Sequence, residues 1–299
     1  MTRRRRLRAI ARRLRDLRPG QAGERCRVCR SRDLVHRDLT YAADPRKTCS
    51  IRRCQNCGYV AILRSEESLW KQRTRLREGH DSARIGTRDR VGREFHIAKM
   101  AVDILGRDKI SVLMYGAGAG MDNLHVERLD EVKRVAIGDI MKVRDDVDFV
   151  DLTEPAREQF DLVIASEVVE HFRNPRPDFD RLFGFVEGDG LVVAATNIHA
   201  GNDLARDHYV FFPDHTSYYS PRSLRRIAND AGFHVDFRAP LIGQRMRKRY
   251  VFFSRSSAVL EDVACYFGTE VYAPSEVARA IRPPAQRSHA AWRPEPEDS

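Results

Sequence analysis

Short apolar runs alternate with amphipathic stretches over residues 109–256. Runs of about four to eight apolar residues between turn-forming residues are typical of buried strands. The runs of this kind lie at 110–115, 132–137, 149–152, 161–165 and 190–196. Their alternation with helical stretches predicts a doubly wound, mostly parallel sheet with helices on both faces.

Both flanks of this region also show regular patterns. Apolar positions over residues 95–105 recur at helical spacing, and Gly106 follows as a stop signal. A second helix is predicted over Arg222–Ala231, before Gly232. The apolar segments 233–237 and 249–254 then predict an antiparallel pair at the edge of the sheet.

The ends of the chain differ from its middle. Residues 1–20 predict a basic amphipathic helix, in which residues 3–18 hold nine arginines and one acid and so supply +8 of the net charge of +10. Such a helix suits RNA or an anionic membrane surface, and a solvated, frayed helix is the alternative. Residues 257–299 predict an extension that is largely disordered after about residue 274. With no apolar run long enough to span a bilayer and no secretory signal, we expect a cytoplasmic protein, with peripheral binding at the inner membrane surface as a variant.

Four of the six cysteines form two Cys-x-x-Cys pairs separated by 24 residues. Two such knuckles can present four thiolates to Zn²⁺ at about 2.3 Å each, and a site with four protein ligands is structural. The predicted ligands of this module, residues 21–63, are Cys26, Cys29, Cys54 and Cys57. Cys49 is the alternative ligand, and Cys265 is expected to lie in the core. A helical connector is expected over residues 64–108.

A glycine-rich segment follows the first strand of the sheet. Gly116, Gly118 and Gly120 come directly after the run 110–115, and Asp139 lies 19 residues beyond Gly120 at the end of the next strand. Glycines there allow a sharp turn and close approach of a ligand, and an acid at the next strand end can bind the ribose hydroxyls of an adenosine-containing ligand.

Three further segments resemble class I S-adenosylmethionine (SAM)-dependent methyltransferases. Residues 160–172 are similar to the fourth-strand motif of that family, 189–193 to its fifth strand, and 220–233 to its closing helix. The resemblance covers residues 95–255. It implies a seven-stranded Rossmann-like sheet over residues 109–256 that binds SAM.

By position, this resemblance assigns a set of SAM-binding residues. The glycines would line the methionine and ribose moieties, Asp139 would hold the ribose diol, Asp151 would approach the adenine, and Ser166 and Glu167 would lie near the methyl group. The implied residues are Gly116, Gly118, Gly120, Asp139, Asp151, Ser166 and Glu167. Many members carry an acid two residues before the first glycine, where this chain has Met114.

The zinc module before a SAM fold resembles bacterial methyltransferases of sugar and surface-glycan biosynthesis. A Glu-His pair supplies the base in that group, and the matching residues here are Asp214 and His215. His215 is therefore the candidate catalytic base and Asp214 its polarising partner. This chain departs from the group by Asp in place of Glu and by Phe212 where some members have Tyr. His171 and His208 are expected to be structural.

Three functions remain open at this level. The first is methyl transfer to a small-molecule or glycan-precursor acceptor, such as a sugar or nucleotide-sugar. The second is RNA methylation, in which the zinc module and residues 3–18 hold RNA. The third is a non-catalytic copy of the fold that acts as a binding protein. The sequence does not indicate which acceptor is used, whether an oxygen, nitrogen or carbon atom is methylated, or what the oligomeric state is.

Overall fold

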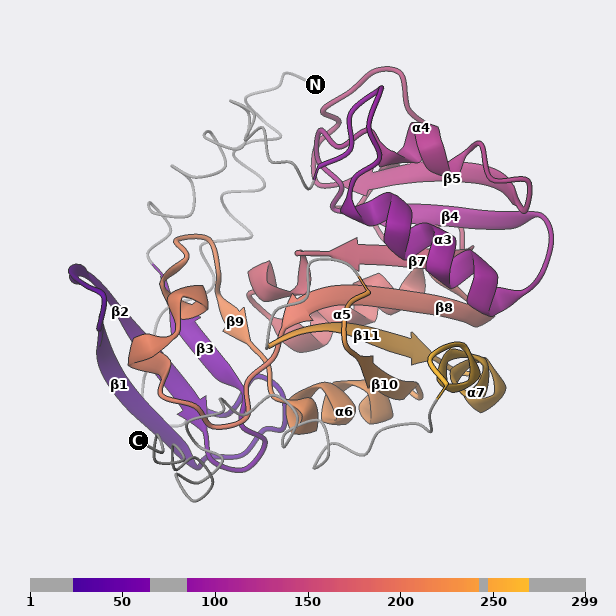
Figure 1. The fold of residues 1–299 in the computed structure, drawn as a ribbon. Coiled ribbons are helices and arrows are strands. Elements are labelled where there is room, and N and C mark those ends of the chain that lie inside the picture. The colour runs from indigo at the N-terminus through magenta and orange to yellow at the C-terminus, as the bar shows by residue number, and fades with distance from the viewer. Residues whose placement is uncertain (1–23, 65–84, 242–246, 269–299) are drawn as a thin grey trace, which may run out of the picture.

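The computed structural model describes residues 24–64, 85–241 and 247–268, which form two β-sheets and the helices around them (Figure 1). The basic helix predicted over residues 1–20 and the tail after residue 274 lie outside the described residues. None of the described helices is long and apolar enough to cross a membrane.

The larger sheet has seven strands in the order β10-β11-β8-β7-β4-β5-β6. Five strands run parallel in its middle and on one side, and β11 pairs antiparallel with both β8 and β10. The strands are β4 (Ile110–Tyr115), β5 (Val132–Asp139), β6 (Phe149–Asp151), β7 (Phe160–Ser166), β8 (Val186–Asn197), β10 (His234–Arg238) and β11 (Lys248–Ser254). The predicted Rossmann-like sheet and its antiparallel edge pair are thus confirmed.

Helices cover both faces of this sheet. Apolar side chains of α3 (Arg93–Leu105) and α7 (Ser257–Tyr266) pack on one face, and those of α5 (Pro175–Gly184) and α6 (Pro221–Asp230) pack on the other. The strands are apolar on both sides because both of their faces are covered. Short helical segments complete the connections: α4 (Asp122–Val126), η2 (Val169–His171), η3 (Leu204–Arg206) and η4 (His208–Phe211).

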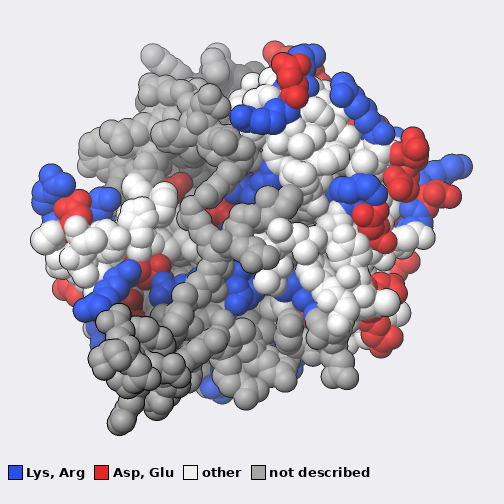
Figure 2. All heavy atoms as spheres, viewed as in Figure 1, with Lys and Arg blue, Asp and Glu red and all other residues white. Residues whose placement is uncertain are grey.

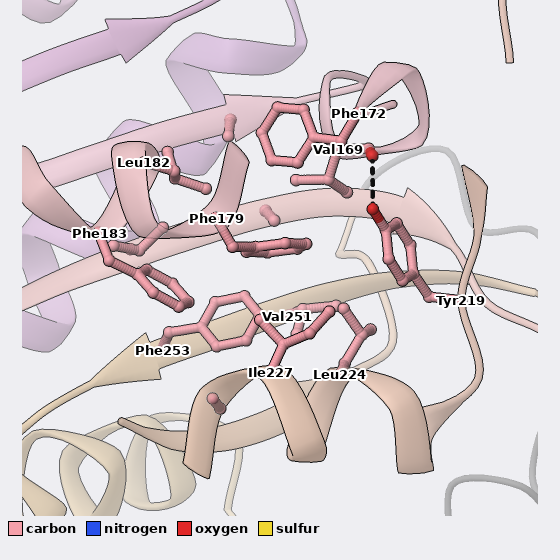
Figure 3. Packing of buried hydrophobic residues seen from close by; sticks show 14 of the residues in the cluster. Val169, Phe172, Phe179, Leu182, Phe183, Tyr219, Leu224, Ile227, Val251 and Phe253 are labelled. Atoms are coloured by element: carbon pink, nitrogen blue, oxygen red, sulfur yellow. Dashed lines mark hydrogen bonds between the residues drawn. The ribbon is translucent and has the colours of Figure 1, made fainter. Parts of the chain in front are cut away.

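Aromatic side chains dominate the core on the α5 and α6 face (Figure 3). The Phe183 ring meets that of Phe253 edge-on, with centroids 5.2 Å apart. Phe183 also stacks on Phe233 with ring centroids 4.2 Å apart. The hydroxyl of Tyr219 donates to the carbonyl of Val169 at 3.0 Å. This bond satisfies a buried phenol and ties the segment after β9 to η2, next to the carboxyl ends of the parallel strands.

The smaller sheet is antiparallel and has the order β1-β2-β3-β9. Strands β1 (Leu34–Tyr41), β2 (Asp44–Cys54) and β3 (Val60–Leu63) come from the cysteine-containing segment. The fourth strand, β9 (Ser217–Tyr218), comes from the chain that leaves β8, and Figure 1 shows it beside β3. The two sheets therefore share one stretch of chain.

Buried contacts also join the cysteine segment to the larger sheet. Cys26, Cys54, Cys57 and Tyr59 belong to the same apolar cluster as the aromatic core around Phe183. The Tyr59 hydroxyl is 2.8 Å from Ser217 Oγ, and Arg27 donates to the carbonyl of Arg173 at 2.6 Å. The cysteine segment is thus packed against the larger sheet and shares its core.

Candidate functional site

The glycine segment and Asp139 meet at the carboxyl ends of β4 and β5. The Gly118 N–H donates to Asp139 Oδ2 at 3.1 Å, and Asp139 Oδ1 accepts from the Ile140 N–H at 2.6 Å. Gly116 and Gly118 have φ of 73° and 57°, a region that favours glycine. A Cβ on Gly116 would stand 2.7 Å from Val168, whereas one on Gly118 would meet nothing within 4 Å. The loop is therefore packed at Gly116 and open at Gly118, beside the carboxylate.

The other predicted SAM-binding residues lie at neighbouring strand ends. Asp151 ends β6, is exposed, pairs in register with Asp139, and accepts from the Thr153 N–H at 2.9 Å. Ser166 ends β7, and its buried hydroxyl has no hydrogen-bond partner among the described residues. Glu167 follows with φ of 57° and forms ion pairs with Lys248 and Arg93. The structure thus brings Gly116, Gly118, Asp139, Asp151, Ser166 and Glu167 to one edge of the sheet, with Gly120 at the end of the loop.

Glu94, which the sequence analysis did not select, also lies against this loop. Its Oε2 is 3.4 Å from the position that a Cβ on Gly120 would take. The pKa of Glu94 is raised to about 7, mainly by burial; the charge of Arg93 opposes this shift and that of Asp122 adds to it. Asp122 in turn accepts from the N–H groups of Gly92 at 2.6 Å and Glu94 at 3.2 Å, which fixes the start of α3.

Arg93 connects the two sides of this edge. One guanidinium nitrogen is 3.2 Å from Glu94 Oε1, and another is 3.7 Å from Glu167 Oε1. Its buried Nε has no hydrogen-bond partner among the described residues. Arg93 and Glu94 lie at the start of α3, before its apolar positions begin. The helical spacing of apolar residues therefore does not indicate that these two residues belong to a site. Their closeness to the glycine loop arises only from the tertiary fold.

A second polar cluster lies where η2 meets the loop before β9. Glu170 is fully buried and His215 is 6 % exposed, and together with His171 they place one ligand atom each within 4.8 Å of one another. Glu170 Oε2 accepts from Thr196 Oγ1 at 3.1 Å, and burial raises the pKa of Glu170 to about 7. The His171 and His215 rings are 5.2 Å apart.

The predicted catalytic pair is adjacent, but its side chains have other partners. His215 Nδ1 is 2.8 Å from the carbonyl oxygen of Tyr209. The Asp214 carboxylate instead lies 3.7 Å from Nδ1 of His171. Burial and His171 lower the pKa of His215 to about 4, so the ring is neutral near pH 7. The roles of His215 as base and Asp214 as its polarising partner stay predictions. His171, expected to be structural, joins the cluster, whereas His208 contacts Tyr41 and Phe212.

The four predicted zinc ligands form one cluster whose Sγ atoms all lie within 4.8 Å of one another. Cys26 and Cys57 Sγ are 3.6 Å apart, and Cys29 and Cys54 Sγ are 3.5 Å apart. Ligands at about 2.3 Å in a tetrahedron lie about 3.8 Å apart, so four thiolates fit one Zn²⁺ here. Cys49 lies elsewhere on β2, paired with Leu39 of β1. Cys265 is exposed, so its expected place in the core was wrong, because α7 turns that position to solvent.

Backbone groups support these thiols. The Val28 N–H donates to Cys26 Sγ at 3.4 Å, and the Cys57 N–H donates to Cys54 Sγ at 3.5 Å. The hydrogen bond from the Cys57 thiol lowers the pKa of Cys26 to about 5, whereas the same pairing raises the pKa of Cys57 and burial raises the pKa of Cys54 to about 11. Gly58, with φ of 77°, makes the turn after the second knuckle. Both knuckles therefore present their sulfur atoms inward, with backbone donors that favour the thiolate form.

Comparison with known proteins gives one match to a family model. Residues 89–236 match the family described as "Methyltransferase domain". This range begins just before α3 and ends within β10, so it contains the glycine loop, Asp139 and the histidine cluster. No curated protein matches the sequence.

Solved structures with similar folds include several methyltransferases. One is an O-methyltransferase from neocarzinostatin biosynthesis in complex with SAM and a naphthoic acid (14% identity, TM-score 0.42, 53% of this chain and 51% of that chain). Another is the complex between the Haloferax volcanii Trm112 methyltransferase activator and a putative methyltransferase (17% identity, TM-score 0.46, 64% and 99%). A third is a Burkholderia thailandensis N1-methyltransferase with bound 1,6-didemethyltoxoflavin and S-adenosylhomocysteine (17% identity, TM-score 0.43, 69% and 94%). The chain spans about half the length of the first of these.

Proposed function

We propose that this chain, whose residues 89–236 match the model of a methyltransferase-domain family, is an enzyme that transfers a methyl group from SAM to a small-molecule acceptor. The observation that carries the proposal is the contact of Asp139 with the Gly118 N–H at the carboxyl edge of the sheet. An acid and a glycine turn at adjacent strand ends are what a doubly wound sheet uses to hold the ribose and the chain of an adenosine-containing ligand.

We expect different residues along this edge of the sheet to bind different parts of SAM. Asp139 would accept hydrogen bonds from the ribose diol, and Asp151, at the next strand end, would approach the adenine. Gly116, Gly118 and Gly120 would leave room for the backbone to approach the cofactor. Ser166 and Glu167 would lie near the methyl group, and the unpaired Ser166 hydroxyl offers a donor there.

The amino-acid end of SAM fits Arg93 and Glu94. The α-carboxylate of SAM would pair with the Arg93 guanidinium, whose Nε is buried without a partner among the described residues. The ammonium group would pair with Glu94 beside Gly120. Glu94 would then do what the acid before the glycines does in other members, where this chain has Met114.

Methyl transfer requires positioning above all. The acceptor attacks the methyl carbon in line with the C–S bond, that bond breaks, and sulfur keeps the electron pair as S-adenosylhomocysteine forms. The acceptor would lie beyond the ends of β7 and β8, against the cluster of Glu170, His171 and His215. His215 is the candidate base there, because its lowered pKa keeps it neutral.

Cationic side chains around this region support an acceptor that carries negative charge, such as a nucleotide-sugar. Arg64 donates to the carbonyls of Val210, Phe212 and His215, and Lys248 and Arg93 flank Glu167. Figure 2 shows Lys and Arg side chains in the middle of the drawn face, over the region between the two sheets of Figure 1. Structural Zn²⁺ in the four-cysteine cluster would hold the smaller sheet against this side.

Formation of S-adenosylhomocysteine tests the proposal. The purified full chain with SAM is incubated with a panel of nucleotide-sugars, with total RNA, or with neither. We expect product only with a member of the small-molecule panel. Product with RNA alone would establish RNA methylation through residues 3–18, and SAM binding without turnover on any acceptor would favour a non-catalytic role.

A further inference from the structure

The cluster formed by Glu170, His171 and His215 has the composition of a metal site. One ligand atom from each residue lies within 4.8 Å of the other two, and Glu170 and His215 are buried. Ligands at about 2.1 Å from a common ion are at most about 4.2 Å apart, so small side-chain rotations close the set around one ion. His171 is partly exposed and leaves one side of the set open.

Both histidines have the hydrogen bonds that metal-binding histidines use. His171 Nδ1 lies 3.0 Å from the Asp214 carbonyl oxygen, and His215 Nδ1 lies 2.8 Å from the Tyr209 carbonyl oxygen. A carbonyl oxygen only accepts, so Nδ1 is the donor in both contacts, and Nε2 is the nitrogen that each ring can offer to an ion. A backbone carbonyl on the second nitrogen orients a ligating imidazole and raises its basicity.

The carboxylate of Glu170 independently indicates that this cluster binds a cation. Its Oε2 accepts from Thr196 Oγ1, which is itself 2.7 Å from the Tyr209 hydroxyl. Its Oε1 is buried and has no hydrogen-bond partner among the described residues. A buried carboxylate oxygen without a partner is costly, and a cation between it and two imidazole nitrogens removes that cost.

We propose that Glu170, His171 and His215 bind a divalent metal ion that also binds a hydroxyl group of the acceptor. Two imidazoles and one carboxylate suit Zn²⁺, Mn²⁺, Co²⁺ or Fe²⁺, with positions left open for exogenous ligands. This inference rests on the proposed function and makes it specific: the enzyme is an O-methyltransferase, and its acceptor has a hydroxyl group that can ligate the ion.

With the ion bound, methyl transfer does not need a protein side chain to take the proton of the acceptor hydroxyl. The metal lowers the pKa of the bound hydroxyl, and its proton passes to water on the exposed side of His171. The resulting alkoxide attacks the methyl carbon, the C–O bond forms, and the C–S electron pair stays on sulfur. In this scheme His215 holds the ion and does not take the proton.

Titration of the full-length, zinc-loaded chain with Mn²⁺, followed by the loss of the free-ion electron paramagnetic resonance signal, tests the site. We expect one Mn²⁺ per chain. Glu170→Gln, which keeps the shape of the side chain, and His215→Ala should each weaken binding about 100-fold or more, because loss of an outer-shell partner alone costs about 10–100-fold. His208→Ala, a histidine outside the cluster, should bind as the unchanged chain does.

Co²⁺ separates this site from the cysteine cluster. A cobalt–thiolate charge-transfer band reports the cysteines, whereas Co²⁺ at the proposed site gives only weak visible bands, which the two cluster variants should lose. The proposal is overturned if both variants bind Mn²⁺ or Co²⁺ as tightly as the unchanged chain does. It is also overturned if the unchanged chain binds no ion beyond the one at the cysteines. SAM titration of the same sample keeps the two proposals apart: SAM binding without the second ion overturns only the metal site, and absence of SAM binding overturns the proposed function.

Discussion

Glu94 places an acid beside the glycine loop, although the strand that precedes the loop carries none at the usual position. The position two residues before Gly116 is Met114, which is buried in the apolar cluster under α3. The carboxylate of Glu94 reaches the other end of the same loop from the first turn of α3, so an acid lies beside the glycines after all. A carboxylate can therefore be placed beside this loop either by the strand before it or by a helix that packs against it.

The raised pKa of Glu94 predicts how stability depends on pH. Between its ordinary value near 4 and about 7, the folded chain keeps a proton that the unfolded chain has released, so this carboxyl lowers stability as pH rises through that window. Glu94→Gln should remove a loss of about 2 kcal/mol between pH 4.5 and pH 7. Urea unfolding of both proteins at a series of pH values measures it. Parallel pH curves for the two would contradict the assignment.

SAM binding should depend on the same group. If the ammonium of SAM pairs with Glu94, binding favours the ionised carboxylate, so affinity should rise by about tenfold from pH 5 to pH 7. Calorimetry in buffers with different ionisation enthalpies would show proton release on binding near pH 6. Glu94→Gln should bind SAM more weakly and lack this proton release; release that persists in the variant would place the proton elsewhere.

At the scale of single residues, the sequence could indicate what lies within a motif. The glycines, Asp139, Ser166 and the four cysteines are marked by spacing and by strand ends, and the structure brings each set together. Glu94, Arg93 and Glu170 are not marked, because each of them also needs contacts with residues far along the chain to reach its place in the site. The partners of His215 and Asp214 depend on the course of the loop before β9, which apolar spacing does not define.

Among the elements, α6 links the larger sheet to the cysteine cluster. Ser220 caps α6 through Ser223 and also donates its hydroxyl to the carbonyl of Cys57 at 2.6 Å. The mostly parallel sheet and the helices on both of its faces were predictable from alternation, and the antiparallel edge pair was predictable from the two apolar segments after α6. The place of β9 in the smaller sheet was not, because a two-residue strand has no periodic signal.

Ser220→Ala should destabilise the chain by about 1–2 kcal/mol, because it removes a helix cap and a buried bond to the second knuckle. Ser256 is the matched control. It is also the N-cap of a helix, α7, but its side chain makes no cap hydrogen bond. Ser256→Ala should therefore change stability by less than about 0.5 kcal/mol. Equal effects of the two variants in chemical unfolding would show that neither the cap of α6 nor the bond to Cys57 contributes to stability.

For the whole molecule, the shared core predicts that, if the four cysteines bind Zn²⁺, loss of this ion affects both sheets together. The cysteines pack in the same cluster as Phe183 and Phe253. Removal of Zn²⁺ by a strong chelator, or Cys54→Ser, should lower the Tm of one cooperative transition by about 10 °C, which corresponds to several kcal/mol at this size. Cys265→Ser, at an exposed cysteine, is the control and should leave the Tm unchanged. Two separate transitions after chelation would mean that the sheets unfold independently.

SAM binding itself is the central claim, and calorimetric titration of the full-length, zinc-loaded chain with SAM tests it most directly. We predict saturable binding with one site per chain. Asp139→Ala should weaken this binding by about tenfold or more, or about 1.4 kcal/mol, through loss of the ribose contact. Asp148→Ala is the matched control, because Asp148 lies beside the same strands but pairs with Arg134; it should bind as the unchanged chain does. Absence of SAM binding by folded protein, or binding that Asp139→Ala leaves unchanged, would contradict the account.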